Sequence, residues 1–261
     1  MRAYRRWPTD TIARALYRAG RPQIDLFEPN AWPQVVEHAE RIGPAEPLTS
    51  RVMDGVGFVF LESRADAEDV DERAGLALRY GYGRGHHHHD NLNVEFFALG
   101  QDMTPELGYP CWAHPMGNTS FVAHHITGMI DRQGQYQSAI AHGTLELFAR
   151  APQASFADVS AQPDGFPNRV YRRAICLADA PGGNVYVFDV LRMAGGTQRT
   201  WCFHGPPVDG FESSLDFVAT GDAALPLNAG LGRGLENNIV EPAAAQADGD
   251  AWADWAYLDQ D

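Results

Sequence analysis

The sequence predicts a mainly β protein, an antiparallel β-sandwich preceded by two short helices. From about Arg51 onward, apolar and polar residues alternate with a period of two over short stretches, which is typical of half-buried strands. Glycine, proline, aspartate and asparagine fill the gaps between these stretches. No helical segment separates them, which favours antiparallel pairing in a sandwich over a parallel sheet with crossover helices.

Strand candidates follow one another at short spacing through most of the chain. They are Val56–Leu61, Leu76–Tyr80, Leu92–Leu99, Phe121–Ile130, Thr144–Phe148, Val170–Leu177, Val185–Met193 and Thr200–Phe203. From Ala223 the pattern fades, and Glu241–Asp250 has the composition of a linker or loop. Trp252, Trp255 and Tyr257 predict one more strand or packing segment.

Two helices are expected before the strands, at Thr9–Gly20 and Pro33–Gly43. Thr9 or Asp10 is placed to cap the first helix, and a glycine ends each of them. His38 in the second helix is interpreted as a surface residue. Two helices of this length do not enclose a core of their own, so we expect them to be the end of a larger helical domain.

Composition and charge exclude several classes of function. The 261 residues are 44% hydrophobic, as in a globular protein, and they provide ample material for a buried core. The net charge is −14, and all 20 basic residues are arginine without a basic run, which argues against general nucleic-acid binding. No apolar run has the length of a signal peptide or a membrane span.

The densest group of chemically active side chains lies between Arg84 and Asp131. If His86 to Leu99 is extended, alternate side chains point to opposite faces of a sheet. One face then carries two histidines and an acid together with four apolar residues: His86, His88, Asp90, Leu92, Val94, Phe96 and Ala98. The other face is polar and expected to be solvated: His87, His89, Asn91, Asn93 and Glu95.

The second histidine pair repeats this arrangement. His124 falls in register with Val122, Ile126 and Ile130, whereas His125 falls with Ala123 and Thr127. His88 and His124 are therefore both expected to point inward. A buried imidazole without a partner costs roughly 1–3 kcal/mol, so these rings need either ordinary hydrogen bonds or a metal.

Zinc is the metal that this set of donors suits, since it accepts imidazole nitrogen and carboxylate oxygen and often has three protein ligands. We expect His88, Glu106 and His124 to bind it. Asp90 is expected to orient an imidazole ligand without binding the metal itself. The alternative is a histidine-rich strand end with ordinary hydrogen bonds.

The same stretch resembles the heparinase II/III-like polysaccharide lyases, which include alginate and oligoalginate lyases. Their β-domain has a His-Gly-His-x-Asp-x-Leu strand, a Pro-Asp-x-Gly-Tyr turn and an Ala-His-Asn-Thr strand ending near Asp-Gly. The counterparts here are His86–Leu92, Pro105–Tyr109 and Ala123–Thr127, ending at Asp131. The later stretch Asn184–Pro207 is similar to that family's Asp-x-Phe-Arg-x-x-Gly-Gly strand pair, which leads into a His-Gly. Three positions differ: His87 replaces glycine, Glu106 aspartate and His125 asparagine.

The resemblance implies a fold and a division of the chain. Residues 1–45 would be the remnant of an α/α toroid, and residues 46–261 a β-sandwich domain truncated at its C-terminal end. In the family the toroid supplies the catalytic tyrosine, so the isolated chain would lack it and be inactive alone. Tyr80, Tyr82 and Tyr109 are expected to serve in packing. The resemblance also implies a periplasmic, envelope or secreted location, although no signal peptide is visible.

The activity that the resemblance implies is β-elimination in a uronic-acid-containing polysaccharide or oligosaccharide. His86 would contact the substrate, while zinc would hold two strands together in a mainly structural role. Asp90 and His125 would support the ligands. Arg84 is a candidate for binding a substrate carboxylate, and a surface charge at a strand end is the alternative.

Two other classes of function remain open. A cupin-like metal oxygenase or isomerase also uses His-x-His, a glutamate and a later histidine, but Glu95 would have to be its acid and is expected on the opposite face from His86 and His88. The second alternative is a non-catalytic carbohydrate-binding β-domain, in which the histidines bind metal for stability alone.

Overall fold

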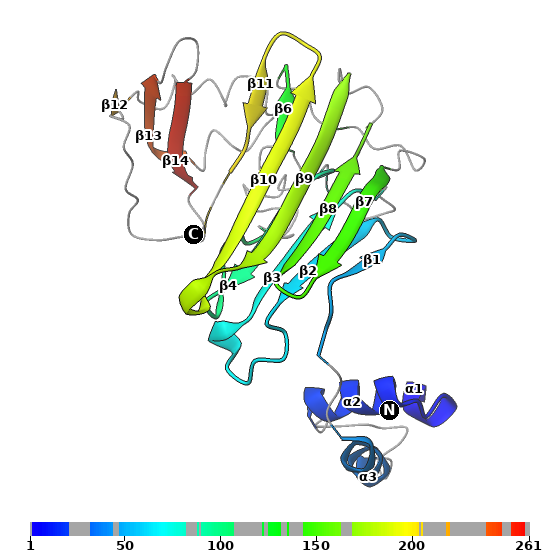
Figure 1. The fold of residues 1–261 in the computed structure, drawn as a ribbon. Coiled ribbons are helices and arrows are strands. Elements are labelled where there is room, and N and C mark those ends of the chain that lie inside the picture. Colours follow the sequence, from blue (N-terminus) through cyan, green and yellow to red (C-terminus); the bar gives the residue numbers. More distant parts are fainter. Residues whose placement is uncertain are drawn as a thin grey trace. The chain divides into compact units, whose positions relative to one another are not determined.

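The computed structural model describes residues 2–20, 32–43, 47–81, 88, 90–106, 122, 125–131, 135, 143–162, 169–203, 205, 218–219, 239–246 and 252–258. The chain divides into two compact units, Met1–Leu48 and Thr49–Asp261, whose elements are labelled in Figure 1. Within the described ranges, no helix combines the length and the apolar character needed to cross a bilayer.

The N-terminal unit contains α1 (Arg2–Arg6), α2 (Asp10–Ala19) and α3 (Trp32–Ile42). The two predicted helices are confirmed, whereas the short α1 was not predicted. Thr9 caps α2, because its hydroxyl accepts a hydrogen bond from the backbone N–H of Ile12 at 3.3 Å. A small cluster of buried apolar residues joins the three helices: Tyr4, Ala13 and Val35.

The interpretation of His38 as a surface residue is wrong. The residue is 8% exposed, and its Nδ1 lies 2.9 Å from the hydroxyl of Tyr4. Its Nε2 lies 2.9 Å from a carboxylate oxygen of Asp10. The unpredicted helix α1 supplies Tyr4, and this is why the sequence pattern of α3 alone placed the ring in solvent.

The larger unit is built from antiparallel sheets, and the predicted mainly β sandwich is confirmed. The first sheet has the order β1-β2-β3-β4-β5, with β1 Arg51–Met53, β2 Phe58–Ser63, β3 Ala74–Arg79, β4 Val94–Ala98 and β5 Gln101–Asp102. The second has the order β10-β9-β8-β7, with β7 Thr144–Ala151, β8 Ala154–Ser160, β9 Val170–Asp179 and β10 Val185–Ala194.

Among the described residues, the unit also has two smaller sheets and two 3₁₀ turns. Strand β11 (Arg199–Trp201) pairs with β6 (Gly128–Ile130). A three-stranded sheet has the order β12-β13-β14, with β12 Val218–Ala219, β13 Ile239–Gln246 and β14 Trp252–Leu258. The 3₁₀ turns are η1 (Val70–Glu72) and η4 (Pro181–Gly183).

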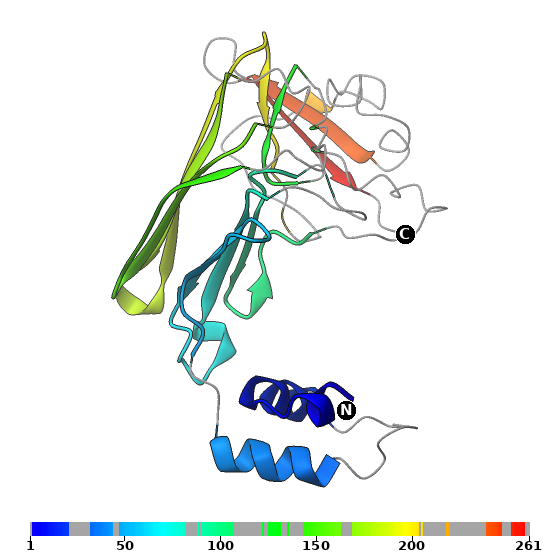
Figure 2. The same cartoon turned by 90° about the vertical axis from the view of Figure 1, so that its right-hand side faces the viewer.

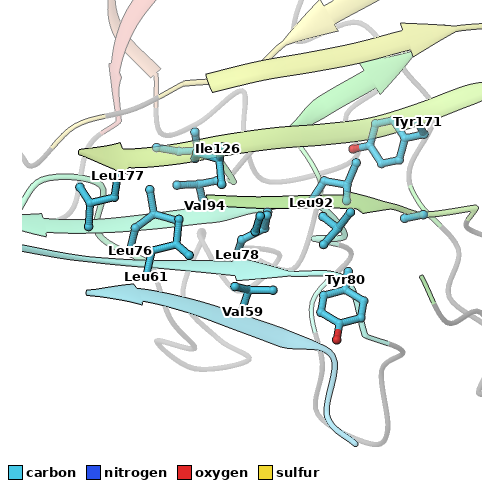
Figure 3. Close-up of a cluster of buried hydrophobic side chains, with 14 of the residues drawn as sticks. Val59, Leu61, Leu76, Leu78, Tyr80, Leu92, Val94, Ile126, Tyr171 and Leu177 are labelled. Carbon is cyan, nitrogen blue, oxygen red and sulfur yellow. The ribbon is translucent and has the colours of Figure 1, made fainter. Parts of the chain in front are cut away.

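The core lies between the first two sheets, where β2 packs against β8 and β9. Figures 1 and 2 show the two layers face to face. Burial alternates along β2 and β3, because every second side chain faces the opposing sheet. Figure 3 shows this apolar layer, to which the two sheets and the adjoining segments contribute Val59, Leu61, Leu76, Leu78, Leu92, Val94, Ile126, Ile175 and Leu177.

Several strands escaped prediction, and β8 and β13 are the longest of them. Strand β8 was not expected, because its inward residues Ser155, Ala157 and Val159 include only one large apolar side chain. It forms because β7 and β9 pair with it on either side. Strand β13 occupies most of Glu241–Asp250, so the linker assignment there is wrong; its pairing with β14 stabilises an alanine-rich segment of low strand propensity. The predicted strand around Trp252 and Trp255 is confirmed as β14.

Candidate metal centre

The first segment that carries site residues is a turn where an extended strand was expected. The backbone N–H of Asn93 donates to the carbonyl of Asp90 at 2.9 Å, and Leu92 has a positive φ of 62°. Strand β4 begins only at Val94. Because the turn removes the alternation, Asn91 and Asn93 are 1% and 4% exposed. The prediction that they are solvated is therefore wrong.

The second segment is also irregular over part of its predicted length. Within the described residues of the expected strand Phe121–Ile130, only Gly128–Ile130 is a strand. Before it, the N–H of Thr127 donates to the carbonyl of His125 at 3.0 Å, a tight turn. His125, Ile126 and Thr127 are 1%, 3% and 0% exposed, so successive side chains here do not separate into a buried and a solvated face.

Three potential metal ligands lie close together beside these two turns. His88 Nδ1 lies 3.0 Å from Glu106 Oε1 and 3.1 Å from His125 Nε2. His125 Nε2 lies 3.4 Å from Glu106 Oε2. The two imidazole rings meet edge to face, with their centroids 5.2 Å apart. The three side chains come from the loop before β4, the loop after β5 and the turn before β6.

These separations fit a tetrahedral metal. Zinc bonds to nitrogen and oxygen are about 2.0–2.2 Å, so two ligand atoms at a tetrahedral angle lie about 3.3 Å apart. The measured separations run from 3.0 to 3.4 Å, and one ligand atom from each residue lies within 4.8 Å of the others. Little rearrangement would be needed for His88, Glu106 and His125 to bind one cation.

The electrostatics of the cluster keep its carboxyl group charged. Burial acts to raise the pKa of Glu106, but hydrogen bonds to His125 and His88, together with the charges of these rings, outweigh it and hold the pKa well below its ordinary value. The pKa of Glu95 is raised by burial and then by the nearby charges of Glu106, Asp102 and Asp90. Charged Glu106 therefore belongs to a crowded acidic environment, which a bound cation would stabilise.

The predicted site residues have different places in the structure. His88 and Glu106 meet directly at 3.0 Å, and His125, expected to support the ligands, supplies the third potential ligand atom. Asp90 accepts a hydrogen bond from Arg79 at 2.7 Å. The remaining three, Arg84, His86 and His124, lie outside the described residues and stay predictions.

A signal in the sequence pointed to His125. In the Ala-His-Asn-Thr motif quoted above, the histidine stands two residues before the threonine. That spacing is kept by His125 and Thr127, whereas His124 is three residues away. Matching the motif from its threonine backward would have identified His125 as a ligand candidate.

Comparisons with known proteins support the fold. No protein-family model matches the sequence, and a search of curated proteins finds no relative. The chain is similar in structure to two proteins described as heparinase III. The first match has a TM-score of 0.51 and 12% identity and covers 82% of this chain. The second, the BT4657 gene product, has a TM-score of 0.57 and 14% identity and covers 86% of this chain. It is also similar to the heparan sulfate lyase HepC from Pedobacter heparinus, with a TM-score of 0.47, 18% identity and 62% of this chain covered.

These matches cover only part of the solved structures. The chain spans 25% of the length of HepC and 34% and 36% of the two heparinase III chains. At these identities the likeness is one of fold. This chain thus shares its fold with a portion of the two heparinase III structures.

Proposed function

We propose that this chain is the metal-binding β-sandwich part of a polysaccharide lyase, which cleaves a uronic-acid-containing glycan by β-elimination. The observation that carries the proposal is the convergence of His88, Glu106 and His125 at the separations that zinc requires. The fold shared with heparinase III adds support, as do the lyase-like motifs around these residues.

Zinc in this site would supply a fixed positive charge that ties the two turns together. Glu106 would neutralise part of that charge, and His88 and His125 would bind through nitrogens that face each other. His86, two residues before His88 in the sequence, would contact the substrate. The role of the centre is therefore mainly structural, with the substrate contacts made by residues beside it.

The reaction itself sets the requirements for the rest of the site. In β-elimination a base removes the proton next to the uronate carboxylate, a carbon–carbon double bond forms, and the bond to the leaving sugar oxygen breaks. That oxygen takes up a proton from an acid. The carboxylate must be neutralised while negative charge develops on the adjacent carbon, a role proposed for Arg84. By resemblance, His86 would contact the substrate and the acid–base tyrosine would come from a helical toroid.

The cupin-like alternative is less well supported by the geometry. It requires Glu95 as the metal-binding acid, but the carboxylate that converges with His88 and His125 belongs to Glu106. Glu95 lies in β4, where it pairs with Ala77 of β3. The non-catalytic carbohydrate-binding alternative has the same metal centre. Only a measurement of lyase activity distinguishes it from the lyase.

Elemental analysis of the purified chain tests the metal centre. We expect about one zinc per chain, which is lost in His88→Ala and in His125→Ala. His124→Ala separates the two neighbouring histidines, and it should retain zinc if His125 is the ligand. Zinc retained by both His88→Ala and His125→Ala would contradict the assignment; stoichiometric iron or manganese in the wild type would favour the oxygenase.

The lyase activity is tested on the longest natural form of the protein, with alginate and heparan sulfate as substrates. Ultraviolet absorbance of the new carbon–carbon double bond reports the product. We expect a signal on at least one glycan, lost in His86→Ala while zinc stays bound. Glycan binding without any unsaturated product would favour the carbohydrate-binding alternative.

A further inference from the structure

Two buried polar side chains of β9 face the turn that follows His88 and the turn that contains His125. Tyr171 is 2% exposed and Arg173 is 1% exposed. Both lie on the inner face of the strand, where the next two inward residues, Ile175 and Leu177, are apolar. Burying a guanidinium and a phenol is costly unless each polar atom is bonded, so their partners indicate what they are for.

Arg173 binds both turns with a single guanidinium group. Its Nη1 donates to the carbonyl of Leu92 at 2.6 Å and to the carbonyl of Ile126 at 2.5 Å. The first carbonyl belongs to the turn after His88, and the second belongs to the residue next to His125. The other side of the group is neutralised by Asp189 on β10, which accepts from Nε at 2.9 Å and also from Nη2.

Tyr171 makes a second connection between the same turns. Its hydroxyl lies 2.7 Å from the hydroxyl of Thr127 and 3.2 Å from the carbonyl of Asn91. Gln135 completes this connection, because its Nε2 lies 2.6 Å from the Tyr171 hydroxyl and its Oε1 accepts from the backbone N–H of Asn91 at 2.9 Å. Both turns are therefore fixed to β9 and to each other.

A direct link between the turns closes the network. The backbone N–H of Ile126 donates to the side-chain oxygen of Asn93 at 2.8 Å. Buried hydrogen bonds need defined directions, so these contacts restrict the distance and rotation between the two backbone segments. The result is that His88 Nδ1 and His125 Nε2 lie 3.1 Å apart.

We propose that Arg173 and Tyr171 are positioning residues of the metal centre. They hold the turn after His88 and the turn of His125 at the separation that a cation requires, so that binding costs little ordering of the backbone. This inference rests on the proposed function where it concerns metal affinity, and on the hydrogen bonds alone where it concerns the order of the two turns. Outer partners that orient metal ligands typically change metal affinity by about 10–100-fold when they are removed.

The test compares Arg173→Met with a matched control, Arg172→Met. Arg172 is the preceding residue of the same strand, but it points to the outer face and pairs with Asp158, with both contacts at 2.6 Å. Zinc affinity is measured by competition with a chromophoric chelator. We expect Arg173→Met to weaken zinc binding by about 10-fold or more, while Arg172→Met stays within about twofold of the wild type.

A milder variant and a measurement on the zinc-free protein distinguish a loss of positioning from unfolding of the whole protein. Tyr171→Phe removes one oxygen and keeps the ring in the core, so it should fold. We expect it to weaken zinc binding by about 10-fold. Amide hydrogen exchange of the zinc-free protein should show faster exchange at Asn91 and Ile126 in both variants, and no change in the Arg172→Met control.

The outcomes separate the inference from the proposed function. If the wild type binds no zinc, the proposed metal centre fails, and the exchange rates at Asn91 and Ile126 still decide whether β9 holds the turns. If Tyr171→Phe and a folded Arg173→Met bind zinc as tightly as the wild type, the positioning role is overturned. If Arg173→Met does not fold, the zinc affinity of Tyr171→Phe decides.

Discussion

The inner face of β9 is apolar at one end and polar at the other, although both ends are equally buried. Ile175 and Leu177 are 0% and 1% exposed, and Tyr171 and Arg173 are 2% and 1% exposed. The apolar pair contributes buried area, which stabilises the sandwich without regard to direction. The polar pair contributes hydrogen bonds, which define one arrangement of the segments that they join. The chain thus places its directional contacts beside the residues of the candidate site.

The largest effect on stability is expected at the polar end. Arg173→Met leaves Asp189 and two backbone carbonyls without their buried partner, so the free energy of unfolding should fall by about 4 kcal/mol. The double variant Arg173→Met/Asp189→Leu removes the unpaired charge and should recover part of this loss. Urea denaturation of the zinc-free protein measures both. A loss below about 1 kcal/mol, as for an exposed ion pair, would contradict the distinction between the two ends.

A slightly smaller effect is expected at the apolar end. Leu177→Ala removes a fully buried side chain from the layer between the sheets and should lower the free energy of unfolding by about 3 kcal/mol. Zinc per chain should not change, because the directional contacts to the two turns remain. Denaturation together with elemental analysis tests this. Loss of zinc from a folded Leu177→Ala protein would show that apolar packing alone positions the site.

The smallest effect on stability is expected at Asp131, whose carboxyl group is well hydrogen-bonded but not buried. Asp131 accepts hydrogen bonds from the backbone N–H groups of Thr197 and Gln198, at 2.6 and 2.8 Å. The bond from Gln198, then those from Thr197, lower the pKa of Asp131 below its ordinary value. A carboxyl with a lowered folded-state pKa stabilises the fold above its unfolded pKa of about 3.9, and this contribution is lost as the pH falls through the folded-state pKa.

Asp131→Asn should therefore make the melting temperature less sensitive to acid. Thermal unfolding followed between neutral pH and about pH 2, a range that includes the ordinary aspartate pKa, measures the difference from the wild type. An unchanged acid dependence would mean that the bonds to Thr197 and Gln198 do not favour the ionised carboxylate.

The sandwich could be predicted because its signal is the apolar alternation itself. Val56–Leu61 and Leu76–Tyr80 were recognised from residues that face the core at every second position, and β2 and β3 occupy most of these ranges. Strand β8 shows the limit of this signal. Its inward side chains are mostly small, and its state is decided by pairing with β7 and β9, the strands before and after it in the chain.

The geometry of the site was less predictable, because it depends on turns. A positive φ at Leu92 is uncommon for a large side chain, and no local pattern indicated it. This turn buries Asn91 and Asn93, whose hydrogen bonds join the site segments. The partner residues Tyr171 and Arg173 lie in a strand that was correctly predicted, but their role depends on which turns that strand meets.

Arg173 contacts a carbonyl 81 residues earlier in the chain and another 47 residues earlier. During synthesis, His88, Glu106 and His125 are all made before β9 exists. A nascent chain that ends before β9 therefore carries every candidate ligand without the residues that hold them in place. Capture of a metal with full affinity would be a late event of folding, because such long-range contacts form only after their loops have closed.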